Sequence, residues 1–406
     1  MGAELVLGGH PLGCLEGVDF VVKSPGVRGN AELLKEARRR GIPVLGELDL
    51  AYMLAPRPIC AVTGTNGKGT TVYLTAHLLR SAGIRCEVAG NDTDRVLIDA
   101  MLGEPPEVLI VAEVSSYQLE GASKFKATAS CVLNVKPEHA DHHGSFEEYA
   151  RAKRRLVELT LPDGFTVLNR DDPVVEGFSR GASCEVLWFS ASGREEAKAR
   201  VVGGFIEVKL EGVEGRLPLD ALRLPGRHNV ENALAAILLA LRLGASMEAV
   251  RRGLETFKGL PHRMELVGEF GGVKFVNDSK ATNPFAVVAA LEAVEGPVLL
   301  LAGGRGKGAD FGPMAEAARG KVRVAFVFGE AKRDLKEAFE RKGVKVEVAR
   351  DLADAFFKAV SMAQPGETVL LSPGCSSLDA YPNYRERGEE FRWLFRRLKE
   401  GHEGRT

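Results

Sequence analysis

Apolar runs alternate with segments of helical periodicity along most of the chain. Segments such as 71–83 and 145–159 carry apolar residues at helical spacing and predict helices. Six short runs between such segments are apolar at nearly every position and predict strands buried on both faces: 59–63, 108–114, 131–135, 298–304, 324–328 and 368–374. This alternation predicts an α/β fold in which parallel sheets are covered by helices on both sides.

Two breaks in this pattern suggest how the chain is divided. The 406 residues are enough for two or three domains of about 150 residues each. Pro56, Arg57 and Pro58 interrupt the chain just before a predicted strand, and Gly259, Leu260 and Pro261 separate a helical segment from a new strand-rich region. A small β-elaboration is expected where short alternating strands occupy 199–219. The predicted domains therefore cover 1–56, 57–261 and 262–406.

Charge and composition exclude several classes of function. The chain has 54 Lys and Arg against 55 Asp and Glu, so its net charge of −1 provides no overall positive field for nucleic acid or an anionic membrane. No apolar run is long enough to span a bilayer, and the first residues lack the pattern of a signal peptide. The six cysteines contain no CxxC pair, which fits a reducing compartment. We expect a cytoplasmic protein without nucleic-acid or membrane partners.

The strongest local motif is TGTNGKGTT at 63–71, between a predicted strand and a predicted helix. In that context a glycine-rich loop binds phosphates through its backbone N–H groups and the helix N-terminus. Lys68 would neutralise the phosphate charge. Gly69 stands where a hydroxyl normally reaches magnesium, so Thr70 or a water molecule would take that part. The alternative is a glycine turn with a solvated lysine.

Further along the chain, Glu113 ends a predicted strand, on the ligand side of an open parallel sheet, where it could hold magnesium. A capping or surface glutamate is the alternative. His139, His142 and His143 lie in one short segment, yet no cysteine or spaced histidine pair completes a tetrahedral zinc set. Lys153 belongs either to a solvated helix face or to a metal site, where a lysine that loses its charge can add carbon dioxide and become a carbamate.

The order of these motifs resembles the Mur ligase family, the ATP-dependent amide-forming enzymes of peptidoglycan assembly. The resemblance covers roughly residues 20–400, in which the TGTNGKGTT loop is followed by eight further segments: EVSSYQLE (113–120), NVKPEHADHH (134–143), YARAK (149–153), GRHNVENALAA (226–236), GLPHRME (259–265), NDSKATNP (277–284), AGGRGKGADF (302–311) and SPGCSSLDAYPNYRERGEEF (372–391). It implies a P-loop ATPase-like central domain and a Rossmann-like C-terminal domain that binds an amino acid.

Within the family, NDSKATN and SPGCSSLD are similar to the member that adds D-glutamate to UDP-N-acetylmuramoyl-L-alanine. The resemblance implies an ATP-dependent ligase that works through an acyl phosphate, with ATP and Mg²⁺ as cofactors, and we expect it to act as a monomer. Two alternatives are a ligase like folylpolyglutamate synthase, which shares the GTNGKG loop, and a nucleotide-binding relative without catalysis. Phosphate release with each acceptor would separate them.

The resemblance also assigns roles to individual residues. ATP phosphates would be bound by the loop residues Gly64, Thr65, Asn66, Gly67, Lys68, Gly69 and Thr70. The nucleotide would be contacted by Asn232, Arg263 and Asp278, and magnesium would be held by Thr70, Glu113, His139 and a carbamylated Lys153, with Lys68, His139 and Lys153 the catalytic residues. Asn91 would contact the muramoyl substrate, and D-glutamate would be surrounded by Lys280, Thr282, Lys307, Ser377 and Tyr384.

Five of these residues have simpler interpretations. Asn232 could only satisfy backbone groups in its helix, and Asp278 could cap the helix that begins near Asn283. Lys307 could be solvated, Ser377 could cap a helix, and Tyr384 could belong to the core.

The N-terminal domain is the one departure from the family pattern. The family's first domain binds the UDP end of the substrate and usually opens with a strand and a glycine-rich turn. Here only its last part is recognisable, at 18–27, 31–41 and 42–50, and no GxGxxG motif precedes it. We therefore expect a shortened N-terminal UDP-binding domain, through a misassigned start codon or a truncation.

Overall fold

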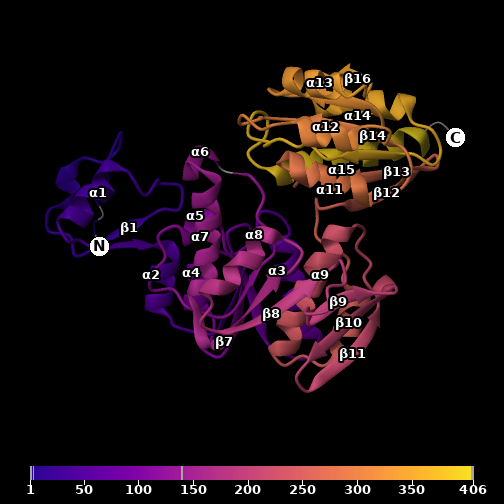
Figure 1. Cartoon of the computed structure of the whole chain (residues 1–406). Helices are drawn as coiled ribbons and strands as arrows, with labels where there is room; N and C mark the ends of the chain where they lie inside the picture. The colour runs from indigo at the N-terminus through magenta and orange to yellow at the C-terminus, as the bar shows by residue number, and fades with distance from the viewer. Residues whose placement is uncertain (1, 3, 139, 404–406) are drawn as a thin grey trace. The chain divides into compact units, whose positions relative to one another are not determined.

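A computed structural model describes residues 2, 4–138 and 140–403 of the chain (Figure 1). These residues form two compact units. The first contains 1–223 and 230–257, and the second contains 224–229 and 258–406. Within the described residues, no helix is both long and apolar enough to cross a membrane.

The first unit begins with a two-stranded parallel sheet of β1 (Val21–Lys23) and β2 (Val44–Gly46). The helices of this segment are the 3₁₀ helix Leu12–Leu15, α1 (Glu32–Arg39) and α2 (Glu47–Leu54). The fully buried Asp49 in α2 accepts hydrogen bonds from the backbone N–H groups of Ser123, Lys124 and Phe125. This carboxylate therefore fixes α2 to the chain that follows α5 (Ser116–Leu119).

A nine-stranded sheet forms the rest of the first unit, in the order β11-β10-β9-β8-β7-β6-β3-β5-β4. Neighbours from β4 to β9 pair in parallel, whereas β9, β10 and β11 are antiparallel, which confirms the predicted β-elaboration (Figure 1). The strands are β3 (Ile59–Thr63), β4 (Cys86–Gly90), β5 (Leu109–Glu113), β6 (Ala127–Val132), β7 (Thr160–Asn169), β8 (Glu185–Ser190), β9 (Ala199–Val202), β10 (Phe205–Leu210) and β11 (Val213–Pro218).

The strand expected at 131–135 begins earlier and ends at Val132. Residues 133–135 do not extend the strand. Instead, the backbone oxygen of Asn134 accepts a hydrogen bond from the Thr65 amide in the loop after β3. The remaining helices of this unit are α3 (Lys68–Ser81), α4 (Leu97–Gly103), α6 (Ala140–His143), α7 (Phe146–Glu158), α8 (Pro173–Glu176), α9 (Arg227–Arg242, whose first residues belong to the second unit), α10 (Met247–Thr256) and the 3₁₀ helices Gly177–Gly181 and Leu219–Ala221.

The second unit is built on a six-stranded sheet in the order β12-β13-β17-β14-β15-β16, parallel except for β12 at one edge. The strands are β12 (Glu265–Phe270), β13 (Val273–Asn277), β14 (Val298–Gly303), β15 (Val322–Phe328), β16 (Val346–Val348) and β17 (Thr368–Leu371). The helices are α11 (Pro284–Ala293), α12 (Gly312–Ala318), α13 (Lys332–Arg341), α14 (Leu352–Met362) and α15 (Tyr384–Glu403).

Alternation along β14 gives this sheet a core on each face. Leu300 packs with α11, α12 and α13, whereas Leu299 and Leu301 pack with α14 and α15. Because both faces are covered, the strand is apolar at every position, as predicted from its sequence. The strand expected at 368–374 ends at Leu371, and residues 372–374 begin a loop.

Candidate active site

The loop between β3 and α3 turns on a glycine that packs against an asparagine. Gly67 is the N-cap of α3 and has φ of 88°, a backbone conformation that favours glycine. A Cβ at this position would collide with Oδ1 of Asn232, a buried residue of α9. Asn232 therefore lies against the phosphate loop. Its side chain does more than satisfy backbone groups of its own helix.

Asn134 holds the first half of the loop, a role that sequence analysis missed. The Asn66 amide donates to Oδ1 of Asn134 at 2.9 Å, and Nδ2 of Asn134 donates to the Asn66 carbonyl at 3.1 Å. The amides of Thr65 and Asn66 are therefore engaged within the protein. The first-turn amides of α3, from Lys68 to Thr70, have no intrahelical acceptor and are the donors suited to a phosphate.

Two lysines converge on the Gly64 carbonyl. Nζ of Lys68 lies 2.9 Å from this oxygen and 3.0 Å from the Thr65 carbonyl, and Nζ of Lys153 lies 2.8 Å from the Gly64 oxygen. Lys153 is only 2% exposed, so the interpretation as a solvated helix face is wrong. Burial, followed by the charge of Lys68, lowers the pKa of Lys153 well below its usual range. An uncharged amine of this kind can attack carbon dioxide.

Tyr149 is a second residue of this group that sequence analysis missed. Its hydroxyl lies 2.9 Å from Oγ1 of Thr65, and its ring lies beneath the Lys153 amine, 4.7 Å from Nζ to the ring centre. Tyr149 and Lys153 are one helical turn apart on α7, which explains why both reach the loop. The signal was present in YARAK, where an aromatic precedes the lysine at this spacing.

Glu113 at the end of β5 has an unsatisfied buried oxygen. Its side chain is 2% exposed, and Oε1 accepts a hydrogen bond from Nδ2 of Asn91 at 3.3 Å. Within the described part of the chain, Oε2 makes no hydrogen bond. A buried carboxylate oxygen without a partner suits a hard cation such as Mg²⁺. Thr70 is also buried, and His139 lies outside the described residues.

His142 and His143 lie near Glu120, and these three residues could in principle hold a metal ion. Oε2 of Glu120 already lies 3.2 Å from Nε2 of His142 and 3.2 Å from Nζ of Lys23, while Nε2 of His143 lies 3.0 Å from Oγ of Ser116. The Lys23 ammonium neutralises the carboxylate and would repel a divalent cation. The cluster therefore fits a structural link between β1 and α5.

In the second unit, Asp278 follows β13 and is almost completely buried. Its carboxylate accepts hydrogen bonds from the Met264 amide at 3.1 Å and from Oγ of Ser372 at 2.9 Å. Burial raises its pKa to about 7, although the charge of Arg263 acts in the opposite direction. The capping interpretation for Asp278 is wrong, because Asn283 caps α11.

Four of the residues expected around D-glutamate lie on segments that follow parallel strands of this sheet, and Tyr384 begins α15. Nζ of Lys280 lies 4.1 Å from the centre of the Tyr384 ring, so these two residues are brought together. The Thr282 amide donates to the Lys280 carbonyl at 2.8 Å. Ser377 is 3% exposed, whereas Lys307 is exposed and has φ of 52°.

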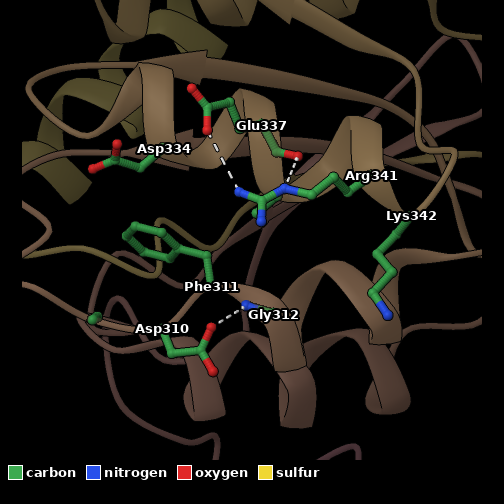
Figure 2. A pocket seen from close by; sticks show the side chains of 9 residues that line it. Asp310, Phe311, Gly312, Asp334, Glu337, Arg341 and Lys342 are labelled. Atoms are coloured by element: carbon green, nitrogen blue, oxygen red, sulfur yellow. Dashed lines mark hydrogen bonds and ion pairs between the residues drawn. The ribbon is translucent and has the colours of Figure 1, made fainter.

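A cavity of about 300 Å³ is lined by residues of α12 and α13 and of the segment just before α12 (Figure 2). Its two basic side chains are paired with carboxylates: Arg341 with Glu337 at 3.5 Å, and Lys342 with Glu316 at 2.7 Å. The Asp310 side chain accepts a hydrogen bond from the Gly312 amide at 2.8 Å. The cavity lining includes none of the predicted site residues.

Comparison with known proteins identifies the family. The Mur ligase middle domain matches residues 62–240, and the Mur ligase glutamate ligase domain matches residues 262–375. The UDP-N-acetylmuramoylalanine–D-glutamate ligase of Pelotomaculum thermopropionicum is 42% identical over 98% of this chain and 88% of the relative. The enzyme of the same name from Caldanaerobacter subterraneus is 40% identical over 96% of this chain and 86% of the relative.

Solved structures agree on the fold. A pseudomurein peptide ligase type C from Methanothermus fervidus has a TM-score of 0.65 at 19% identity and covers 96% of this chain and 89% of its own. UDP-N-acetylmuramate-alanine ligase from Thermotoga maritima has a TM-score of 0.64 at 19% identity, with coverages of 94% and 86%. The predicted family and α/β fold are therefore confirmed, and this chain belongs to the Mur ligase family.

Proposed function

We propose that this chain joins D-glutamate to UDP-N-acetylmuramoyl-L-alanine, with ATP as the energy source, in the synthesis of peptidoglycan precursors. The similarity to relatives that carry this name over nearly the whole chain supports the substrate pair. The observation that carries the chemistry is the buried Lys153 amine, 2.8 Å from the carbonyl of Gly64 in the phosphate loop. In this position the amine contacts the loop that would bind the phosphates of ATP.

The first unit fits ATP and magnesium. The first-turn amides of α3 and the Lys68 ammonium would bind the phosphates, because they supply N–H donors and positive charge at one loop. Glu113 and Thr70 would hold Mg²⁺, together with His139 and a carbamylated Lys153. A bound Mg²⁺ would disperse the negative charge of the triphosphate. The unpartnered Oε2 of Glu113 supports this assignment.

The proposed reaction has two steps. The terminal carboxylate of UDP-N-acetylmuramoyl-L-alanine attacks the γ-phosphorus of ATP, the bond to the β-phosphate oxygen breaks, and ADP leaves. The amine of D-glutamate then attacks the acyl phosphate, loses a proton, and phosphate departs as the amide forms. Lys68 and the loop amides stabilise the charge that develops on the transferred phosphoryl group.

The second unit would supply the amino-acid site. D-glutamate carries two carboxylates, and Lys280 and Lys307 provide positive charge for them while Thr282 and Ser377 provide hydroxyls. Tyr384 would fix the Lys280 ammonium through the contact with its ring. As the resemblance implies, Asn232, Arg263 and Asp278 would contact the nucleotide, and Asn91 would contact the muramoyl substrate beside Glu113. We further propose that the enzyme acts as a cytoplasmic monomer.

The test is phosphate release by the purified protein with ATP, Mg²⁺ and UDP-N-acetylmuramoyl-L-alanine, in the presence of D-glutamate or L-glutamate. Release that depends on both the muramoyl substrate and D-glutamate is the expected result. Release with a folate acceptor instead would identify a folylpolyglutamate synthase-like ligase. Binding of ATP without release under any of these conditions would indicate a nucleotide-binding relative without catalysis.

A further inference from the structure

One buried arginine connects the chain segments that carry the proposed D-glutamate residues. Arg387 lies on α15 and is completely buried. It hydrogen-bonds to Ser279 after β13, to Gly303 at the end of β14 and to Cys375 after β17. These are the carboxyl ends of three parallel strands, where α/β sheets place their ligand sites.

The hydrogen bonds use all three nitrogens of the guanidinium. Nε donates to Oγ of Ser279 at 3.0 Å, and Nη1 donates to the carbonyls of Gly303 and Cys375, both at 3.2 Å. Nη2 donates to the carbonyls of Ser279 at 2.8 Å and Cys375 at 3.2 Å. The five N–H groups of an arginine are thus matched by five contacts.

Among the described residues, none of these contacts is to a carboxylate. Burial lowers the pKa of Arg387 to about 10, so the side chain stays charged at neutral pH. The charges of Asp379 and Asp278 act on the guanidinium and offset part of the cost of burying it, but replacing a buried charged group by apolar residues of similar volume is often neutral or stabilising. Stability alone therefore does not explain why an arginine occupies position 387. The need to hydrogen-bond three separate backbone segments does explain it.

The joined segments lead directly to the proposed site. Ser279 immediately precedes Lys280, and its hydroxyl donates to the carbonyl of Tyr384 at 2.8 Å. Cys375 lies two residues before Ser377. The loop after Gly303, which carries Lys307, is paired with the loop after Cys375, because Arg305 and Ser376 exchange backbone hydrogen bonds of 2.8 and 3.0 Å.

We propose that Arg387 is a positioning residue for D-glutamate: it sets the spacing of Lys280, Lys307 and Ser377 without contacting the substrate itself. This inference rests on the proposed function. Lysine cannot replace it, because a single ammonium cannot reach three separated backbone segments. The consequence is specific, since a misplaced amino-acid site should weaken D-glutamate binding while ATP and the muramoyl substrate bind as before.

The test compares Arg387→Lys, Arg387→Ala and Ser279→Ala with the wild type in steady-state phosphate release, with each of the three substrates varied in turn. Arg396→Lys, an exposed arginine on the same helix, is the matched control. We expect the KM for D-glutamate to rise about 10- to 100-fold in Arg387→Lys, with the other two KM values within about threefold of wild type. Ser279→Ala should show the same selectivity with a smaller rise, because it removes one of the five contacts of Arg387 together with the hydrogen bond to the Tyr384 carbonyl.

Guanidinium added to Arg387→Ala should lower the KM for D-glutamate again, while the same concentration of ammonium should not. Thermal unfolding of each variant shows whether it is folded, and Ser279→Ala provides the milder variant if Arg387→Ala is not. Equal changes in all three KM values, or an unchanged KM for D-glutamate in both Arg387→Lys and Ser279→Ala, would overturn the inference while the proposed function stood. A wild-type protein without D-glutamate-dependent release would overturn both.

Discussion

Nζ of Lys153 donates a hydrogen bond of 2.8 Å to the carbonyl oxygen of Gly64, which joins the middle of α7 to the first glycine of the phosphate loop. The same oxygen also accepts from Lys68 at 2.9 Å. Two ammonium groups at one carbonyl repel each other, and the buried one is more easily neutralised. The lowered pKa of the buried Lys153 amine is what the proposed carbamate requires.

Lys153→Ala should therefore lose activity by about 10²–10³-fold, because it removes a group aimed at the phosphate-transfer site. Short carboxylates such as formate or acetate should restore part of the phosphate release, since they can occupy the place of the carbamate. Thermal unfolding gives the control, as the variant should remain folded. Normal activity in Lys153→Ala, or a loss with no rescue by any carboxylate, would contradict the carbamate hypothesis.

Gly67→Ala should weaken ATP binding and lower stability. The new methyl group would collide with the Asn232 amide, and the backbone would retain φ of 88°, a conformation that costs an alanine about 1 kcal/mol. Gly83→Ala is the matched control: it has φ of 77° but no atom within 4 Å of the added carbon. ATP affinity measured by calorimetry should fall only in Gly67→Ala, and equal affinity in the two variants would contradict the steric argument.

Glu113→Gln should raise the Mg²⁺ concentration needed for half-maximal activity by about tenfold or more, because the metal would lose an anionic ligand. The substitution keeps an oxygen that can accept the hydrogen bond from Asn91. Titration of phosphate release with Mg²⁺ at fixed ATP measures the change. Glu120→Gln is the control, since its carboxylate is engaged by His142 and Lys23; an equal shift in both variants would count against a ligand role for Glu113.

The alternation of apolar runs and helical segments was sufficient to predict the strands and their burial, because a parallel strand covered on both faces must be apolar throughout. The ends of strands were less predictable. Val135 is as apolar as the strand before it, yet the strand ends at Val132 because Asn134 binds the phosphate loop. Such an end is decided by a tertiary hydrogen bond, which local sequence does not encode.

Candidate site residues in recognisable motifs could be proposed from the sequence, whereas residues that contact those motifs through packing or hydrogen bonds could not. Arg387 lies in a charged helical segment, RERGEEF, and nothing in that segment marks which charge is buried. Tyr149 and Asn134 were likewise visible as residues but not as partners of Thr65 and Asn66. Their roles depend on which segments the fold brings together.

Asp278 should make the free energy of unfolding depend on pH. Its pKa is raised from 3.8 to about 7 in the folded protein, so between these values the folded state holds a proton that the unfolded state has lost. The unfolding free energy therefore falls as pH rises from about 4 to about 7, by up to about 4 kcal/mol, and this contribution is constant above that range.

Denaturant titrations of wild type and Asp278→Asn at several pH values measure the effect, because all other groups titrate alike in both proteins. The difference in unfolding free energy, wild type minus variant, should fall across this window. A difference that stays flat between pH 4 and 7 would show that Asp278 is ionised throughout, stabilised by Arg263 and Arg387.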